Sequence, residues 1–211
     1  TSSRVSKSAL VEAHGERLAP CYLENVFEGL TRPGQWYLDR SSGQLYYIPR
    51  KGETLRDTEV IAPRAVQLVR LDGVPAENRY VEWLRFEGIA FAHTDWVQPG
   101  DGHPHLPREL WSEVERRPSL RYRRGEASSA QGAADVPGAI YMTGARNISF
   151  ENCRVSNIGW YGMEVGDGCQ AVRIVGNEID DLGAGGVKIN GASFQEPADR
   201  RTGYCRVTDN E

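Results

Sequence analysis

The chain contains the stretch ISFENCRVSNIG at residues 148–159, and the stretch VRIVGNEIDDLG follows it at residues 172–183. The two stretches align without a gap at an offset of 24 residues (172 − 148 = 24). Apolar side chains recur at the same places in both, whereas the polar side chains between them differ. This pattern indicates a structural repeat in which each copy buries the same face.

Each copy consists of short alternations of apolar and polar residues, which are typical of β-strands. Gly, Asn and Asp separate the alternations, as expected of turns. A further alternation at residues 163–165 recurs at residues 187–189, again 24 residues later. Three short strands and three turns in about 24 residues make one coil of a solenoid whose coils stack about 4.8 Å apart. We therefore predict an all-β fold, a right-handed parallel β-helix.

Two more coils extend the repeat in both directions. Residues 206–211 repeat residues 173–178 at an offset of 33 (206 − 173), and residues 84–91 align with residues 148–155 at an offset of 64 (148 − 84). The second offset equals one coil of 24 residues plus an insertion of 40 residues. One turn position changes along the coils from an apolar residue to Asn, and stacked Asn amides are expected to hydrogen-bond along the helix axis. This column contains Ile89, Cys153, Asn177 and Asn210.

The repeat also sets the predicted domain organisation. Residues 1–79 form an N-terminal β-rich segment with a hairpin at residues 33–49, because Pro and Gly bound two short aromatic runs there. Residues 80–211 form the coils, with a loop insertion at residues 97–136. The last residues stop inside a coil, and the first lack Met and a signal sequence, so we expect a fragment of a longer chain.

Four aromatic residues in the hairpin have two interpretations: they stack on a sugar, or they pack a small β subdomain. They are Trp36, Tyr37, Tyr46 and Tyr47.

Composition narrows the function classes. The formal net charge is −4, which argues against a nucleic-acid partner. No apolar run approaches 18 residues, so we predict no membrane span. The four Cys residues are scattered without a CxxC pair, which favours core thiols over a metal site, with one disulfide as the alternative. We expect a monomer without a cofactor and with no metal-ligating residues.

Six further motifs accompany the repeat and are spread over most of residues 20–211. They are ENVFEGL at 24–30, PGQWYLD at 33–39, GQLYYIP at 43–49, VPGAI at 136–140, NISF at 147–150 and NEIDDLG at 177–183. Together with the repeat, these motifs resemble those of the large family of secreted right-handed β-helix proteins that includes pectin and alginate lyases and several glycoside hydrolase families. The similarity is greatest to the hydrolase-type members, which are grouped with α-fucosidases and xylan-acting enzymes. The resemblance implies a secreted, periplasmic or extracellular protein that acts on a polysaccharide or oligosaccharide.

The repeat also gathers polar and aromatic residues along one edge of the predicted helix. The offsets place Asn157 one coil below Asp181, and His93 two coils below it. Acids, amides and aromatic faces together are what carbohydrate sites need. The candidate catalytic residues are Asp181 and Asp180, and the candidate substrate-binding residues are His93, Asp95, Trp96, Asn157, Trp160 and Tyr161. Asp and Asn are also common turn residues for purely structural reasons.

Glycosidases use two carboxyl groups about 5–5.5 Å apart for retention or about 6.5–9.5 Å apart for inversion. An acid one coil above Asp181 would meet this requirement, and that position lies beyond Glu211. The hydrolase-type relatives place catalytic Asp residues on successive turns, and Asp181 matches that position best. The chain has Asp180 where many relatives have His, which leaves the proton-transfer partner open.

Three functions therefore remain. The first is a glycoside hydrolase acting on plant or microbial polysaccharide. The second is a polysaccharide lyase, which would need a Lys or Arg base and Ca²⁺. Lys188 and Glu164 lie one strand beyond the strip but do not form an evident calcium cluster. The third is a non-catalytic β-helix that binds glycans or serves as a spacer.

Overall fold

The computed structural model describes residues 26–96, 136–191 and 197–211. The chain divides into two compact units, residues 1–61 and residues 62–211. Apart from short 3-10 helices, the regular structure of the described residues is entirely strand. None of the helices in these ranges is long and apolar enough to cross a membrane.

The described part of the first unit is a β-hairpin preceded by the 3-10 helix η1 (Phe27–Gly29). Strands β1 (Trp36–Asp39) and β2 (Gln44–Tyr47) pair antiparallel, which confirms the predicted hairpin. The turn between them is organised by the Asp39 carboxylate, which accepts hydrogen bonds from the hydroxyls of Ser41 and Ser42, each at 2.6 Å. These hydroxyl donors and the Ser41 backbone N–H lower the pKa of Asp39 to about 2.

Aromatic contacts within the hairpin unit favour the packing interpretation of its aromatic residues. The Phe27 ring meets the rings of Tyr37 and Tyr46 edge-on, with centroid distances of 5.3 and 5.2 Å. Trp36 remains outside this group and is 61% exposed.

The described residues of the second unit form four stacked coils. The first coil contains β3 (Val69–Asp72), η2 (Pro75–Glu77), β4 (Val81–Glu82), β5 (Arg85–Glu87) and β6 (Ala90–Ala92). The second contains β7 (Gly138–Thr143), β8 (Ala145–Arg146), β9 (Ser149–Glu151) and β10 (Arg154–Ile158). The third contains β11 (Tyr161–Val165), β12 (Arg173–Val175) and β13 (Glu178–Leu182), and the fourth β14 (Val187–Ile189), η4 (Ala198–Arg200) and β15 (Arg206–Thr208).

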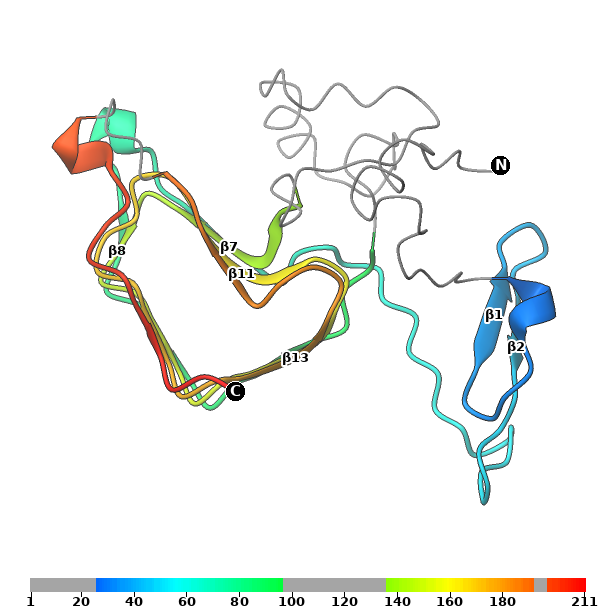
Figure 1. The fold of residues 1–211 in the computed structure, drawn as a ribbon. Coiled ribbons are helices and arrows are strands. Elements are labelled where there is room, and N and C mark those ends of the chain that lie inside the picture. Colours follow the sequence, from blue (N-terminus) through cyan, green and yellow to red (C-terminus); the bar gives the residue numbers. More distant parts are fainter. Residues whose placement is uncertain (1–25, 97–135, 192–196) are drawn as a thin grey trace, which may run out of the picture. The chain divides into compact units, whose positions relative to one another are not determined.

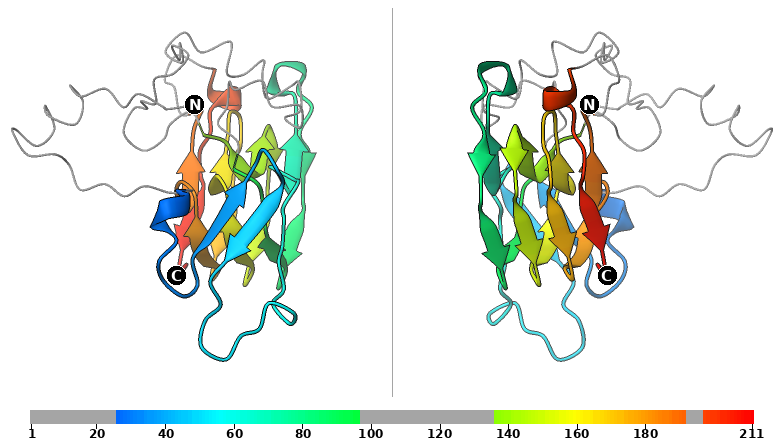
Figure 2. Two further views of the ribbon diagram at one scale, coloured as in Figure 1. Left: turned by 90° about the vertical axis from the view of Figure 1, so that its right-hand side faces the viewer. Right: turned by 90° about the vertical axis from the view of Figure 1, so that its left-hand side faces the viewer.

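Corresponding strands of successive coils pair in parallel and form three long sheets. Their orders are β3-β7-β11-β14, β5-β9-β12-β15 and β6-β10-β13, and the short strands β4 and β8 also pair. Figure 1 views the unit along the coil axis, so that the traces of the coils almost superimpose, whereas Figure 2 shows the coils side by side. This is the predicted parallel β-helix.

The strand register confirms all three predicted offsets. Ser149 pairs with Arg173 (offset 24), Arg173 pairs with Arg206 (offset 33), and Phe86 pairs with Phe150 (offset 64). The first coil, however, begins earlier than predicted, because β3 pairs with β7 from Val69 onward.

The predicted boundary between residues 79 and 80 is therefore too late, and the contacts divide the chain after Ile61. The sequence did not reveal that β3 belongs to this coil, because the insertion separates β3 from its partner β7 along the chain. Residues 97–135 of that predicted insertion lie outside the described residues.

Each coil bends at corners where one residue adopts a left-handed backbone. Ten non-glycine residues of the described ranges have positive φ, and nine of them fall on three corner columns (4 + 2 + 3). Glycines complete the second column. The first corner contains Trp83, Asn147, Ala171 and Tyr204; the second Gly88, Asn152, Gly176 and Asp209; and the third His93, Asn157 and Asp181. The remaining residue is Asn78, which caps η2.

Apolar side chains fill the interior of the coils. The Phe86 and Phe150 rings stack in parallel, with centroids 4.5 Å apart and an interplanar angle of 5°. Phe91 meets both rings at steep angles. Cys153 and Cys169 are buried free thiols, which confirms their predicted place in the core. Burial raises the pKa of Cys169 to about 12.

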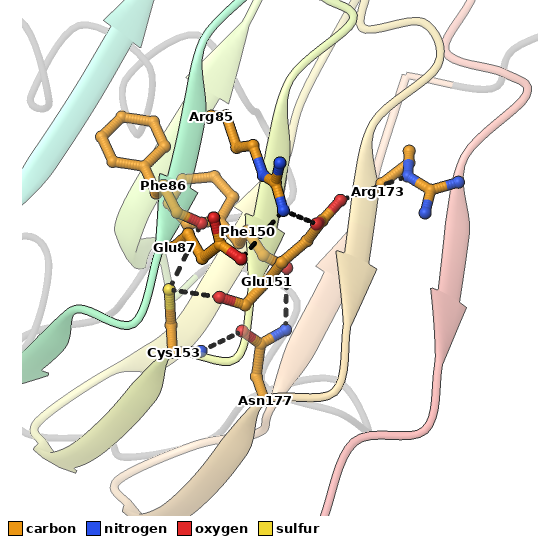
Figure 3. A network of polar contacts seen from close by, with 8 residues as sticks. All are labelled: Arg85, Phe86, Glu87, Phe150, Glu151, Cys153, Arg173 and Asn177. Carbon is orange, nitrogen blue, oxygen red and sulfur yellow. Dashed lines mark hydrogen bonds and ion pairs between the residues drawn. The ribbon is translucent and has the colours of Figure 1, made fainter.

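A short asparagine ladder crosses the turn that follows the second corner, and Figure 3 shows the hydrogen bonds of Asn177 with Cys153 and Phe150. The Asn177 side chain accepts the Cys153 N–H at 2.9 Å, and its Nδ2 donates to the backbone carbonyl of Phe150 at 3.0 Å and to the side-chain Oδ1 of Asn210 at 2.8 Å. Asn210 repeats the arrangement one coil later, where its side chain accepts the Asn177 N–H and donates to the Ile174 carbonyl. The predicted hydrogen bonding of stacked Asn amides is confirmed. Ile89, at the open end of the column, is 41% exposed rather than buried.

Replacing Asn177 with Ala should lower the free energy of unfolding by about 3 kcal/mol, because two buried backbone groups lose their partners. The exposed corner variant Asn152→Gly is the matched control and should change it by less than about 0.5 kcal/mol. Urea denaturation of both purified variants measures the difference. Equal stability of Asn177→Ala and the parent protein would contradict the role of the ladder.

Candidate functional site

The third corner column forms the centre of the candidate site. His93, Asn157 and Asp181 stand on successive coils, with φ angles of 65°, 54° and 51°. Sheet β6-β10-β13 holds them in register, since Ser156 pairs with Ala92 on one side and with Asp180 on the other. The Asn157 amide donates a hydrogen bond to the Asp181 carboxylate at 2.5 Å. An exposed carboxylate is thus held in place by the coil beneath it.

Asp180 lies in a different environment from Asp181, although the two are adjacent in sequence. The Arg154 guanidinium, on the neighbouring strand β10, lies 3.4 Å from the Asp180 carboxylate and 3.1 Å from that of Glu178. All three side chains are about half exposed. Asp180 is therefore engaged in an ion pair on the sheet surface, whereas Asp181 interacts with a neutral amide.

Two glycines close the turn next to this column. A Cβ atom at Gly183 would lie 1.9 Å from the carbonyl oxygen of Gly159, and a Cβ atom at Gly159 would lie 2.4 Å from that of Asp95. The Gly159 N–H also donates to the Thr94 hydroxyl at 2.9 Å. Only glycine permits this close stacking, which explains why both quoted repeats end in Gly. The stacking fixes the backbone of Asp95 one coil below Gly159.

The aromatic residues of the predicted strip separate into exposed and buried ones. Trp96 is 48% exposed, and Tyr161 is half-buried. Trp160 is completely buried and packs with Val66 and Val136 in a second hydrophobic cluster. The expectation that Trp160 presents a face to substrate is therefore corrected: its ring faces a small core.

A buried ion pair extends the site onto the outer face of sheet β3-β7-β11-β14. Lys188 Nζ lies 3.2 Å from the Glu164 carboxylate and 5.0 Å from the centroid of the Tyr161 ring. The side chains of Glu164 and Lys188 are only 6% and 12% exposed. Glu164 also accepts hydrogen bonds from the Gly138 N–H at 2.9 Å and from the Asn190 amide at 2.7 Å. Tyr161 therefore links the predicted strip to a pair that the sequence placed just outside it.

The repeat contained a signal for this pair. Glu164 lies between apolar residues in one copy, and Lys188 takes the same place 24 residues later, so the register stacks the two charges. Such a position in a buried alternation indicates pairing rather than solvation. The described residues contain no group of three His, Cys, Asp or Glu side chains that would hold a metal ion.

Comparisons with known proteins agree with this architecture. A sequence model described as "Right handed beta helix region" matches residues 128–211. The second unit is a right-handed parallel β-helix. A solved structure described as "Glycoside hydrolase" shares 26% sequence identity with the chain at a TM-score of 0.58, and the match covers 84% of this chain. The chain spans 30% of the length of that structure. No curated protein matches the chain. The first match agrees with the parallel β-helix, and the second shows that the chain is similar to a solved glycoside hydrolase.

Within the β-helix, the Glu164–Lys188 pair should contribute to stability only as a pair. Lys188→Met should lower the free energy of unfolding by about 3–5 kcal/mol, because Glu164 keeps a buried charge without its cation. The double variant Glu164→Gln/Lys188→Met should recover most of this loss. Urea denaturation of the single and double variants gives the coupling energy.

Arg85→Met is the matched control, because it breaks an ion pair with Glu151 in which Arg85 is 57% exposed. It should cost less than about 1 kcal/mol. A Lys188→Met variant no less stable than Arg85→Met would contradict the buried-pair interpretation.

Proposed function

We propose that the chain is part of a glycoside hydrolase that acts on plant or microbial polysaccharide and uses Asp181 as one of two carboxylates. The observation that carries the proposal is the exposed Asp181 carboxylate, held by the Asn157 amide on the stacked coil below. Similarity to a solved glycoside hydrolase supports the reaction class. The proposed protein is secreted and monomeric and needs no cofactor.

The stacking of coils would place a second carboxylate at a catalytic distance from Asp181. Equivalent residues of successive coils lie about 4.8 Å apart, close to the carboxyl separation of about 5–5.5 Å in retaining glycosidases. The coil below Asp181 supplies Asn157, which positions the carboxylate instead of competing with it as an acid. In this proposal the partner carboxylate belongs to another coil of the same edge.

The ion pairs favour Asp181 over Asp180 as the reacting group. Asp180 is held by Arg154, so its charge is already engaged on the sheet surface. We assign Asp180 to the ordering of Arg154. The proposed substrate contacts are His93 in the same column and Trp96 on the loop that follows it, together with Asp95 and Tyr161.

Incubating the protein with pectic, xylan and fucosylated glycans tests the reaction class. New reducing ends without absorbance from unsaturated uronates are expected. Both signals together would identify a lyase. Binding without turnover of any glycan would identify a non-catalytic binding protein.

Asp181→Asn should reduce the rate of hydrolysis by at least about 100-fold, because it removes a carboxylate that acts in the reaction. Asn readily adopts the left-handed backbone of residue 181, so the fold should persist. Asp209→Asn is the matched control, since Asp209 is also an exposed corner Asp with φ of 57°. It should retain full activity. Undiminished hydrolysis by Asp181→Asn would refute the assignment.

A further inference from the structure

The first corner column contains two aromatic residues in unusual positions. Parallel β-bridges fix the register of this edge. They join Glu82 to Arg146, Arg146 to Gln170, and Gln170 to Gly203. The residues that follow these four therefore form the column on successive coils. They are Trp83, Asn147, Ala171 and Tyr204, with φ angles of 63°, 53°, 54° and 57°.

Neither aromatic residue is explained by local structure. Bulky side chains are disfavoured in the left-handed region, where Gly, Asn and Asp are accommodated far more easily. The other two corners follow this preference and contain only Gly, Asn, Asp and His. Burial gives no compensation, because Trp83 is 76% exposed and Tyr204 is 90% exposed. Large apolar rings exposed at a conformational cost indicate contact with a ligand.

The column has the dimensions and chemistry of a binding strip. Trp83 and Tyr204 are three coils apart, which is about 14 Å along the axis. The small side chains of Asn147 and Ala171 occupy the positions between them. The adjacent column supplies the polar residues Glu82, Arg146 and Gln170. Arg146 is itself ordered, since its guanidinium lies 3.3 Å from the centroid of the Tyr80 ring.

Flat rings flanked by polar groups suit a ligand that presents apolar faces and hydroxyl groups at intervals. A polysaccharide has both features, and its pyranose rings offer C–H faces to aromatic side chains. A polynucleotide also offers faces for stacking, but the net charge of −4 disfavours it.

We infer that the first corner is a glycan-binding strip in which one sugar ring stacks on Trp83 and another, farther along the same polysaccharide, stacks on Tyr204. It is separate from the Asp181 column: β8, which leads into the first corner, and β13, which contains Asp181, lie on opposite sides of the coil (Figure 1). The strip holds a polysaccharide along the coil axis whether or not the chain cleaves it.

Affinity electrophoresis of the folded protein in gels that contain soluble xylan or homogalacturonan tests the strip. The parent carries Asp181→Asn, so that the polysaccharide stays intact. We expect at least one of the two polysaccharides to retard this parent. The double variant Trp83→Asn/Tyr204→Asn in the same background should lose affinity at least about tenfold, because both stacking faces are removed. Trp36→Thr, which removes another exposed tryptophan, should bind as the parent does.

The thermal midpoint separates binding from folding. Asn suits a left-handed corner, so the double variant should unfold at the parent's temperature or above it. Retardation by neither polysaccharide, or equal retardation of the parent and the double variant, would overturn the inference.

A second assay distinguishes the binding strip from the catalytic proposal. It measures how fast the double variant, with native Asp181, hydrolyses a short soluble oligosaccharide. Its rate should equal that of the unmodified protein. An absence of hydrolysis in both proteins would refute the catalytic proposal and leave the electrophoresis result to decide the strip.

Discussion

Every coil of the β-helix must repeat the backbone path of its neighbour at the spacing of paired strands, about 4.8 Å. Three corners make this repetition feasible, because a left-handed residue at the same place in each coil turns the chain without breaking the ladders on either side. Side chains at equivalent positions are consequently stacked. The phenylalanine stack, the asparagine ladder and the Asn157–Asp181 contact all follow from this constraint.

The same constraint explains why the sequence predicted the register so well. One residue of slippage would turn Met163 and Val187 from the core to the surface, so the apolar alternation specifies the pairing. The ladder was predictable for the same reason, since Asn177 and Asn210 occupy one position of the repeat. What the offsets missed depended on contacts between positions that do not repeat. Trp160 is buried by Val66 and Val136, and both lie outside the aligned stretches.

The candidate site was predictable as a column, but not in its interactions. Register placed His93, Asn157 and Asp181 on one edge and stacked Asn157 on Asp181, whereas the partner of Asp180 depended on a side chain two residues away along the next strand. Arg154 illustrates this point, because it pairs with Glu178 directly across the sheet and also reaches Asp180 diagonally. The repeat therefore predicted which positions are neighbours, whereas the length of the Arg154 side chain determines which carboxylates it reaches.

The left-handed corners also distinguish residues that backbone preference explains from residues that it does not explain. Backbone preference alone explains an Asp at position 181, because Asp readily adopts the left-handed conformation. The chemical role of Asp181 must therefore be argued from its contacts and exposure. Backbone preference does not explain Trp83 and Tyr204, and burial does not explain them either, because both rings are exposed. The corners of this β-helix favour Gly, Asn and Asp because of their left-handed backbone. A corner residue of another type, such as Trp83 or Tyr204, is therefore stronger evidence for a ligand than a corner Asp or Asn.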